Sequence, residues 1–216
     1  MNKIIPLKFD SNSIKEDHKN LVSYWKRIKG DSTYRLNYDS LSDEGIVFDV
    51  GGYEGKWAKD IFCKYMPYMY IFEPVPYFME GILETFKYNK KVSPFLFGFD
   101  GFNGTADFYV NASSSSALKA DGQKIKVKMR KMSDFIIETG LEKIDLVKLN
   151  VEGSEYAIIE ELYFSGLLPR ICSLQIQFHY FVDDSFEKIQ KIRSFLSETH
   201  TMDWGFDFVW ENWSLK

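Results

Sequence analysis

The sequence has little of what marks secreted, metal-stabilised or membrane proteins. Its only two cysteines, Cys63 and Cys172, lie far apart in segments with helical and strand-like patterns, so neither a disulfide framework nor a zinc site is expected. Met1–Asp10 has one brief apolar stretch, and no run approaches the roughly 18 apolar residues that a membrane helix needs. These absences predict a cytoplasmic protein with no membrane span and no metal.

An excess of positive charge is also missing. The chain carries 27 Lys and Arg against 31 Asp and Glu, for a formal net charge of −4. Nucleic-acid-binding proteins concentrate cations that displace counterions from phosphates. The basic stretch Lys124–Arg130 alternates cations with apolar side chains, which indicates a half-exposed strand. We therefore expect no nucleic-acid partner.

The composition, with 45% hydrophobic and 27% charged residues, is that of a globular protein, and 216 residues suffice for one domain spanning 1–216. Strands and helices alternate from residue 46 onward, which predicts an α/β fold on a mostly parallel sheet. The expected strands are Ile46–Val50, Tyr68–Phe72, Val92–Phe97, Ile144–Leu149 and Ser173–Phe178. The expected helices are Glu54–Tyr65, Tyr77–Tyr88, Ser154–Phe164 and Ser185–Glu198.

Two regions depart from this alternation. Residues 1–44 are expected to form a helical lead-in or lid, with a helix over 12–30. Residues 102–132 contain two extended segments, Thr105–Val110 and Gln123–Met132, and predict a small β insertion.

The end of the chain predicts a pair of strands around Thr201–Trp204 and Phe206–Trp210. Gly205 between them is interpreted as a tight turn.

An acid followed by glycines marks the end of the first predicted strand. Asp49 ends the apolar run, and Gly51, Gly52 and Gly55 follow at the turn into the helix. In an open parallel sheet this turn lies where ligands bind, and glycine lets the backbone approach a ligand closely. The spacing is not G-x-G-x-x-G, and Asp49 would repel a diphosphate. The pattern favours a cofactor with a cationic group.

A second acid, Glu73, ends the next predicted strand and is followed by Pro74. A carboxylate at this position of a nucleotide-binding sheet accepts hydrogen bonds from the ribose hydroxyls. Together with the glycine turn, Glu73 indicates an adenosine that carries no phosphate.

Three ordered motifs in the chain resemble those of the FkbM family of methyltransferases, over roughly residues 46–179. Asp49–Gly55 matches D-V-G-x-x-x-G, and Phe72–Pro74 matches F-E-P. Lys148–Gly153 matches K-I-D-V-E-G, except that Asn150 replaces the usual Asp.

The resemblance implies a Rossmann-like class I methyltransferase with a seven-stranded, mostly parallel sheet whose last strand is antiparallel. The implied cofactor is S-adenosylmethionine, with the methionine part near Gly51, the ribose at Glu73 and the adenine near Gly98–Asp100. Asp100 is equally well explained as a turn residue before Gly101. The cofactor-binding residues that follow from the motifs and the resemblance are Asp49, Gly51, Gly52, Tyr53, Gly55, Glu73, Pro74, Gly98, Phe99, Asp100 and Asn150.

Transfer of a methyl group to an alcohol needs alignment and a base that takes the proton. Asn150 can orient a hydroxyl but cannot accept its proton. Glu152 and His179 are therefore the candidate bases, with Asn150 as a further catalytic candidate. A neutral imidazole suits the role near pH 7, although His179 could equally be a structural residue. Glu152 could instead cap the helix that follows it.

The resemblance implies O-methylation of a sugar hydroxyl in glycan or secondary-metabolite biosynthesis, so the expected partner is a small-molecule or glycan substrate. Two alternatives stay open: methylation of a non-sugar small molecule, and a non-catalytic S-adenosylmethionine-binding protein, which the loss of the Asp at position 150 makes conceivable. A nicotinamide-dependent oxidoreductase would need the phosphate-tolerant glycine turn that this sequence lacks.

Overall fold

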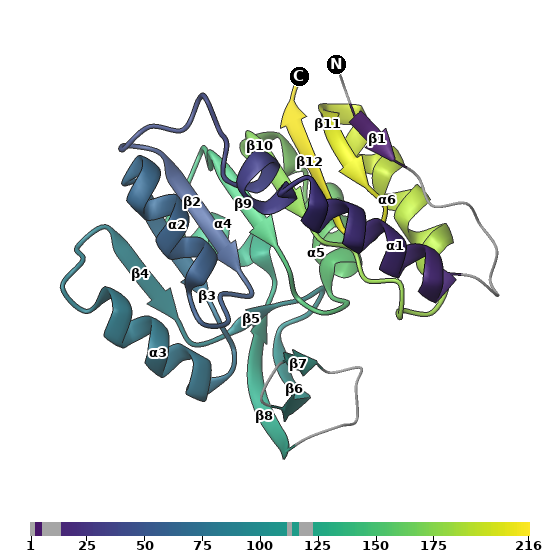
Figure 1. The fold of residues 1–216 in the computed structure, drawn as a ribbon. Helices are drawn as coiled ribbons and strands as arrows, with labels where there is room; N and C mark the ends of the chain where they lie inside the picture. The colour runs from purple at the N-terminus through teal and green to yellow at the C-terminus, as the bar shows by residue number, and fades with distance from the viewer. Residues whose placement is uncertain (1–2, 6–13, 112–113, 117–122) are drawn as a thin grey trace.

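The computed structural model describes residues 3–5, 14–111, 114–116 and 123–216, which form a central eight-stranded sheet with helices on both faces and a smaller sheet below it (Figure 1). In spatial order the strands of the central sheet are β1 (Lys3–Ile5), β11 (His200–Phe206), β12 (Trp210–Leu215), β10 (Ser173–Ile176), β9 (Leu146–Leu149), β2 (Ile46–Val50), β3 (Tyr68–Phe72) and β4 (Val92–Phe95).

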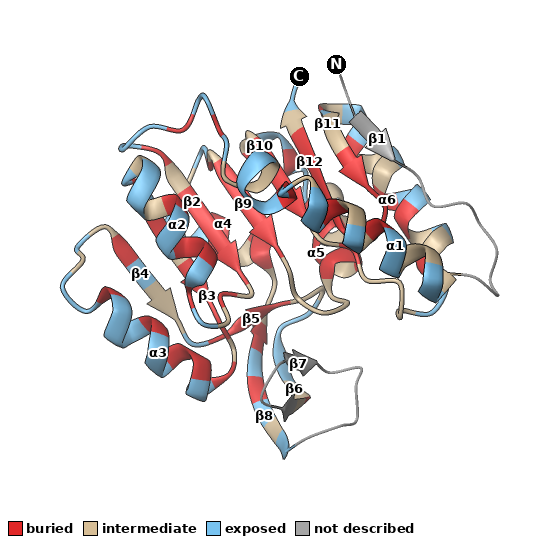
Figure 2. Ribbon diagram, viewed as in Figure 1, coloured by how far each residue is buried: buried red, intermediate tan, exposed pale blue. Residues whose placement is uncertain are grey.

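Strand β12 runs antiparallel to both of its neighbours, β10 and β11, whereas the other neighbouring pairs are parallel. The predicted seven-stranded, mostly parallel sheet with one antiparallel strand is thus confirmed. Strand β1 adds an eighth strand at the edge, which the sequence did not predict. The strands β2, β9 and β10 are buried along almost their whole length because helices cover both faces of the sheet (Figure 2).

Alternate residues of each central strand pack against different helices. The helices are α1 (Ile14–Arg27), α2 (Lys56–Tyr65), α3 (Pro76–Phe86), α4 (Met132–Thr139), α5 (Glu155–Phe164) and α6 (Ser185–Thr199). Val47 on β2 belongs to the cluster formed with α2 and α3, whereas Phe48 belongs to the cluster formed with α4, α5 and α6.

The predicted insertion forms a separate four-stranded sheet. Its strands are, in spatial order, β5 (Gly98–Phe99), β8 (Gln123–Arg130), β6 (Gly104–Asn111) and β7 (Ser114–Ser116). The expected hairpin corresponds to the antiparallel pair of β6 and β8. Strand β8 ends at Arg130 and not at Met132 as predicted. Helix α4, which begins at Met132, was not predicted. Met132 and Ile136 are fully buried, so tertiary packing stabilises a helix too short to show a clear periodic pattern.

The prediction that Gly205 forms a tight turn was wrong. Gly205 lies inside β11, and the turn comes later, where Phe208 takes the left-handed conformation (φ 56°) and Val209 N donates to Phe206 O over 2.8 Å. Gly205 is instead a position of close packing, because a Cβ there would lie 2.8 Å from Met202 Sδ.

The helix expected over 12–30 corresponds to α1, with residues 12–13 lying outside the described residues. It is followed by a short π-helix, η1 (Asp31–Arg35), which packs on the sheet beside β10. This connection brings the lead-in segment to the carboxyl ends of the central strands.

A buried charge cluster fastens the last hairpin to α6. Arg193 on α6 donates to Asp207 in the turn and to Glu211 on β12, and Trp213 Nε1 donates to the other oxygen of Glu211 over 2.9 Å. Glu211 is only 1% exposed. Because burial disfavours the charged carboxylate, the cluster holds together only while Arg193 balances it.

We expect Arg193→Met to lower the free energy of unfolding by about 3–5 kcal/mol, since it leaves Asp207 and Glu211 buried without their counter-charge. Lys191→Met is the matched control: its ion pair with Glu160 is exposed, so its loss should cost less than about 1 kcal/mol. Denaturation in urea measures both, and equal losses for the two variants would contradict the assignment.

Candidate active site

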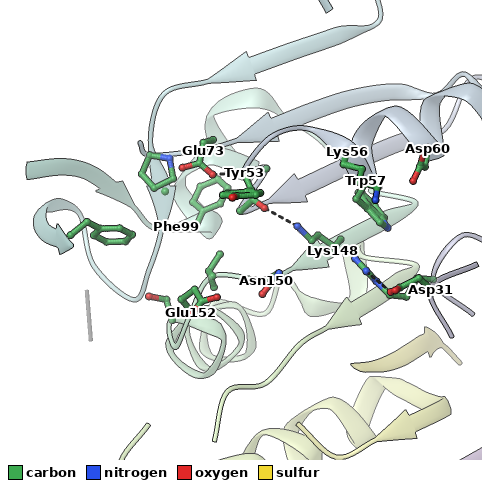
Figure 3. A pocket seen from close by; sticks show the side chains of 18 of the residues that line it. Asp31, Tyr53, Lys56, Trp57, Asp60, Glu73, Phe99, Lys148, Asn150 and Glu152 are labelled. Atoms are coloured by element: carbon green, nitrogen blue, oxygen red, sulfur yellow. Dashed lines mark hydrogen bonds and ion pairs between the residues drawn. The ribbon is translucent and has the colours of Figure 1, made fainter. Parts of the chain in front are cut away.

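A cavity of about 480 Å³ opens at the carboxyl ends of β2, β3 and β9, a volume in the range of about 300–1,000 Å³ that is typical of small-molecule sites. Its wall comes from the turn after β2, the end of β3, strand β5, the loop after β9, helix α2 and the π-helix η1. Figure 3 shows Glu73, Tyr53 and Phe99 at one end and Asp31, Trp57, Lys56 and Asp60 at the other, with Lys148 and Asn150 between them.

The glycine turn after β2 lines the cavity and can be built only from glycine at its first position. Gly51 has φ 82°, and a Cβ there would lie 2.0 Å from the Asn150 carbonyl oxygen. Gly52 and Tyr53 also line the cavity, whereas Gly55 lies outside its wall. The backbone of this turn is therefore exposed to any ligand in the cavity.

Asp49 lies beneath this turn and is fully buried. Its Oδ1 accepts from Lys148 Nζ over 2.8 Å, and the same ammonium donates to the Gly51 carbonyl oxygen over 2.8 Å. Burial lowers the pKa of Lys148, and the neighbouring Asp49 carboxylate opposes that shift. Lys148, not Asp49, faces the cavity. Asp49 therefore contacts the site through the lysine.

Glu73 lines the cavity and is 3% exposed. Its two oxygens accept from the backbone N–H groups of Tyr53 (2.7 Å) and Val75 (2.9 Å). Burial raises the pKa of Glu73 to about 7, and these two hydrogen bonds partly counteract the increase. Each oxygen keeps a second lone pair with which it can accept from a ligand.

Of the predicted cofactor-binding residues Pro74, Gly98, Phe99 and Asp100, only some line the cavity. Pro74, Gly98 and Phe99 line the cavity. Asp100 does not: its oxygens accept from Gly101 N over 2.6 Å and from Ser154 Oγ over 2.7 Å. The bond from Gly101 N is the kind that a turn residue accepts.

The loop after β9 brings Asn150 and Glu152 to the cavity wall. The buried Oδ1 of Asn150 has no hydrogen-bond partner among the residues that the structure describes. Glu152 takes the left-handed conformation (φ 54°), which is strained for a residue with a Cβ and is typical of functional sites. Both residues are therefore part of the wall that a ligand in the cavity would contact.

His179 lies behind Glu152, in the loop after β10 and outside the cavity wall. Its Nδ1 is 2.6 Å from Glu155 Oε1, and its Nε2 is 3.7 Å from Glu152 Oε1. Glu155 is fully buried and also accepts from the backbone N–H groups of Val151 (3.2 Å) and Gly153 (3.0 Å). One carboxylate thus holds both the imidazole and the strained loop.

Sequence reasoning missed the wall opposite Glu73. This distal wall consists of Asp31, Arg35, Lys56, Trp57 and Asp60. These residues belong to η1 and α2, outside the motifs, so they are recognised as part of the site only because the folded chain brings them to the cavity. The one local sign is Trp57, a buried aromatic in the first turn of the helix that follows the glycine turn.

The sheet order, the glycine turn and the acid after β3 define a class I S-adenosylmethionine-dependent methyltransferase. Residues 49–208 match the methyltransferase FkbM domain, and the chain therefore belongs to the FkbM methyltransferase family. Its cofactor is S-adenosylmethionine.

The folds of several solved methyltransferase-related structures are similar to this one at low sequence identity. Fibrillarin, a pre-rRNA processing protein of Methanococcus jannaschii, is 12% identical with a TM-score of 0.49, over 83% of this chain and 70% of that one. A putative rRNA methylase of Clostridium thermocellum is 10% identical with a TM-score of 0.48, over 82% and 91%. Fibrillarin of Aeropyrum pernix, solved with S-adenosylmethionine, is 9% identical with a TM-score of 0.47, over 84% and 70%. The comparison with curated proteins gives no match.

The residues of the cavity fit the cofactor. Trp57 Nε1 and Asn150 Oδ1 are buried polar atoms of the wall without a hydrogen-bond partner in the described part of the chain. An unpartnered buried polar atom is costly unless a ligand satisfies it. The wall also offers exposed backbone at Gly51 and Gly52 and a carboxylate at Glu73, the groups that a polar nucleoside requires.

Within residues 3–5, 14–111, 114–116 and 123–216, no three His, Cys, Asp or Glu side chains are arranged to hold a metal ion. Among the same residues, no helix combines the length and apolar character needed to cross a bilayer.

We expect Lys148→Met to lower the free energy of unfolding by about 3–5 kcal/mol, because it leaves the Asp49 carboxylate buried and uncompensated. The double variant Asp49→Asn with Lys148→Met should lose less, since no buried charge remains. Urea denaturation of the wild type, the two single variants and the double variant measures this coupling. Additive losses would show that the pair does not interact as its geometry indicates.

Glu73 should make the protein less stable as pH rises. Its pKa is about 7 when folded against 4.5 otherwise, so between these values the folded chain binds more protons than the unfolded one. The stability contributed by Glu73 is complete below pH 4.5 and is lost as pH rises through 7, by up to about 3 kcal/mol.

The measurement is urea denaturation between pH 4.5 and 8 for the wild type and for Glu73→Gln. The wild type should lose stability relative to the variant across this window. Parallel curves for the two proteins would show that Glu73 titrates normally.

Proposed function

We propose that the protein transfers a methyl group from S-adenosylmethionine to a sugar hydroxyl in a small molecule or a glycan. The sugar acceptor is what the family resemblance implies. The observation that carries an alcohol acceptor is the Glu152 carboxylate in the cavity wall, with His179 and Glu155 behind it. A carboxylate so placed supplies the base that an alcohol needs and an uncharged amine does not.

The end of the cavity near Glu73 suits the adenosine part of the cofactor. Glu73 accepts from the ribose hydroxyls with the lone pairs that Tyr53 N and Val75 N leave free. Gly98 and Phe99 provide a close, apolar surface for the adenine. When bound, the cofactor supplies a methyl group activated by its sulfonium. The protein's task is to orient the acceptor and exclude water.

Glu152 is the proton acceptor in this proposal, and His179 is a positioning residue. Glu152 lines the cavity, whereas His179 lies outside its wall with Nε2 3.7 Å from Glu152 Oε1. Glu155 fixes the imidazole at 2.6 Å and fastens the loop that carries Glu152. Asn150 orients the acceptor hydroxyl with its Oδ1, which has no hydrogen-bond partner among the described residues. The Asp that the family has at position 150 is then not needed as the base.

Charge disfavours a polyanionic acceptor such as RNA. The chain has a net charge of −4, and four acidic side chains stand in the cavity wall: Asp31, Asp60, Glu73 and Glu152. Binding along a phosphate backbone depends on clustered cations. The proposed acceptor is therefore neutral, or carries its charge away from the reacting hydroxyl.

Methyl transfer from labelled S-adenosylmethionine tests the proposal on a panel of nucleotide-linked sugars, free oligosaccharides, non-sugar alcohols and RNA. We expect label in a sugar as a base-stable methyl ether. Glu152→Gln should reduce kcat by about 100-fold or more, because removal of a general base typically costs about 10²–10⁴-fold. Its affinity for the cofactor should stay within twofold of the wild type.

Glu160→Gln, a change at an exposed carboxylate on α5, is the matched control and should leave kcat unchanged. Label in RNA or only in non-sugar alcohols would overturn the acceptor class. A wild-type kcat for Glu152→Gln would overturn the base. Cofactor binding without transfer to any acceptor would point to the non-catalytic binding protein.

A further inference from the structure

Arg35, on the distal wall, is held in place by residues of strands β10 and β12. Its Nε donates to Gln175 Oε1 over 3.1 Å, and Gln175 Nε2 returns a bond to the Arg35 carbonyl oxygen over 3.0 Å. The guanidinium also lies 3.7 Å from the centre of the Trp210 ring. Gln175 is fully buried on β10, and the Arg35 side chain is 15% exposed. A planar guanidinium fixed in this way presents its remaining N–H groups in one direction, as recognition of a carboxylate or phosphate requires.

Asp31 stands beside Arg35, and both charges face the same cavity. Arg35 Nη1 donates to Asp31 Oδ1 over 2.8 Å, and both residues line the wall. They lie four residues apart on the π-helix η1, a rare conformation that is frequent at functional sites. The wall therefore offers an adjacent cation and anion.

A neutral donor on the same wall lacks a partner. Trp57 is 9% exposed, and its Nε1 has no hydrogen-bond acceptor within the described parts of the chain. Figure 3 shows Trp57 and Asp31 at the end of the cavity away from Glu73 and Phe99. A ligand group that accepts hydrogen bonds is thus expected at this end.

The charge balance of the wall distinguishes a carboxylate from a phosphate. Arg35 and Lys56 face Asp31 and Asp60, so this end is close to neutral. Lys148 adds little attraction because Asp49 already pairs with it at 2.8 Å. A phosphate, with up to two negative charges, would be repelled by both aspartates. A zwitterion with one carboxylate and one ammonium adds no net charge and can place each of its charges beside an opposite charge of the wall.

We propose that Arg35 and Trp57 bind the carboxylate of the cofactor's amino-acid end and that Asp31 binds its ammonium. This inference rests on the proposed function, since it places the methionine part at the far end of the same cavity. It also gives the segment before β2 a role in cofactor recognition. The glycine turn, to which the sequence assigned the methionine part, then contacts the middle of the cofactor.

Calorimetry with three ligands tests the assignment: S-adenosylmethionine, its decarboxylated form, and 5′-methylthioadenosine, which lacks the amino-acid end. Arg35→Met should weaken S-adenosylmethionine by about 10- to 100-fold, as expected for a charge-assisted hydrogen bond. It should leave 5′-methylthioadenosine within twofold and abolish the preference for the ligand with the carboxylate. Asp31→Asn should weaken the first two ligands alike and spare the third.

Arg170→Met is the matched control, because Arg170 pairs at the surface with Glu142, outside the cavity wall. Thermal unfolding checks that each variant is folded. If Arg35→Met does not fold, Trp57→Phe carries the test, with an expected loss of roughly 3- to 10-fold for S-adenosylmethionine and none for 5′-methylthioadenosine.

Three results would overturn the inference: an unchanged preference for the carboxylate in the folded Arg35→Met and Trp57→Phe variants, an equal loss for all three ligands, or unchanged cofactor affinity with a raised KM for the acceptor. The failure of the proposed function has a different signature. In that case the wild type and the variants would keep the ligand preferences expected here, and no methyl group would reach a sugar hydroxyl.

Discussion

Lys148 donates from the middle of the sheet to two acceptors, the Asp49 carboxylate on β2 and the carbonyl oxygen of Gly51 in the turn. This contact joins strands β2 and β9 at the point where the chain leaves the sheet. A buried lysine and a buried aspartate are each costly alone, so neither position tolerates loss of the other. The pair thereby links the glycine turn after β2 to strand β9, which leads to Asn150, and both the turn and Asn150 line the cavity.

A second buried carboxylate, that of Glu155, stabilises the loop after β9 in a similar way. Glu155 accepts from the N–H groups of Val151 and Gly153 and stabilises a loop in which Glu152 has a positive φ. The same carboxylate holds His179. Strain in the loop and the orientation of the imidazole are thus balanced by one group. The loop that carries the proposed base is consequently held by hydrogen bonds on both sides of Glu152, which reduces the cost of alignment.

The distal wall shows how the segment before β2 completes the cavity. Gln175 and Trp210 lie on strands β10 and β12, and they hold Arg35 in place although it is remote from both in sequence. The end near Glu73 is made largely by residues of the motifs, while this end is made by residues from η1 and α2. The two ends therefore differ in how readily a sequence reveals them.

The sequence by itself determined the alternating sheet, the family and the residues of the glycine turn and Glu73, because each depends on short spacings along the chain. Hydrophobic period, glycine position and strand-end acids are local signals, and β2 and β3 were predicted to the residue. The predicted turn at Gly205 was wrong because close packing against Met202 places this glycine inside a strand. Helix α4 was not predicted because its burial in the core, and not a local pattern, stabilises it. Only the tertiary structure decided that Asp49 faces a lysine, that His179 stands behind Glu152, and that Arg35 reaches the cavity. These contacts join residues separated by 27 to 140 positions, and no local pattern encodes such distances.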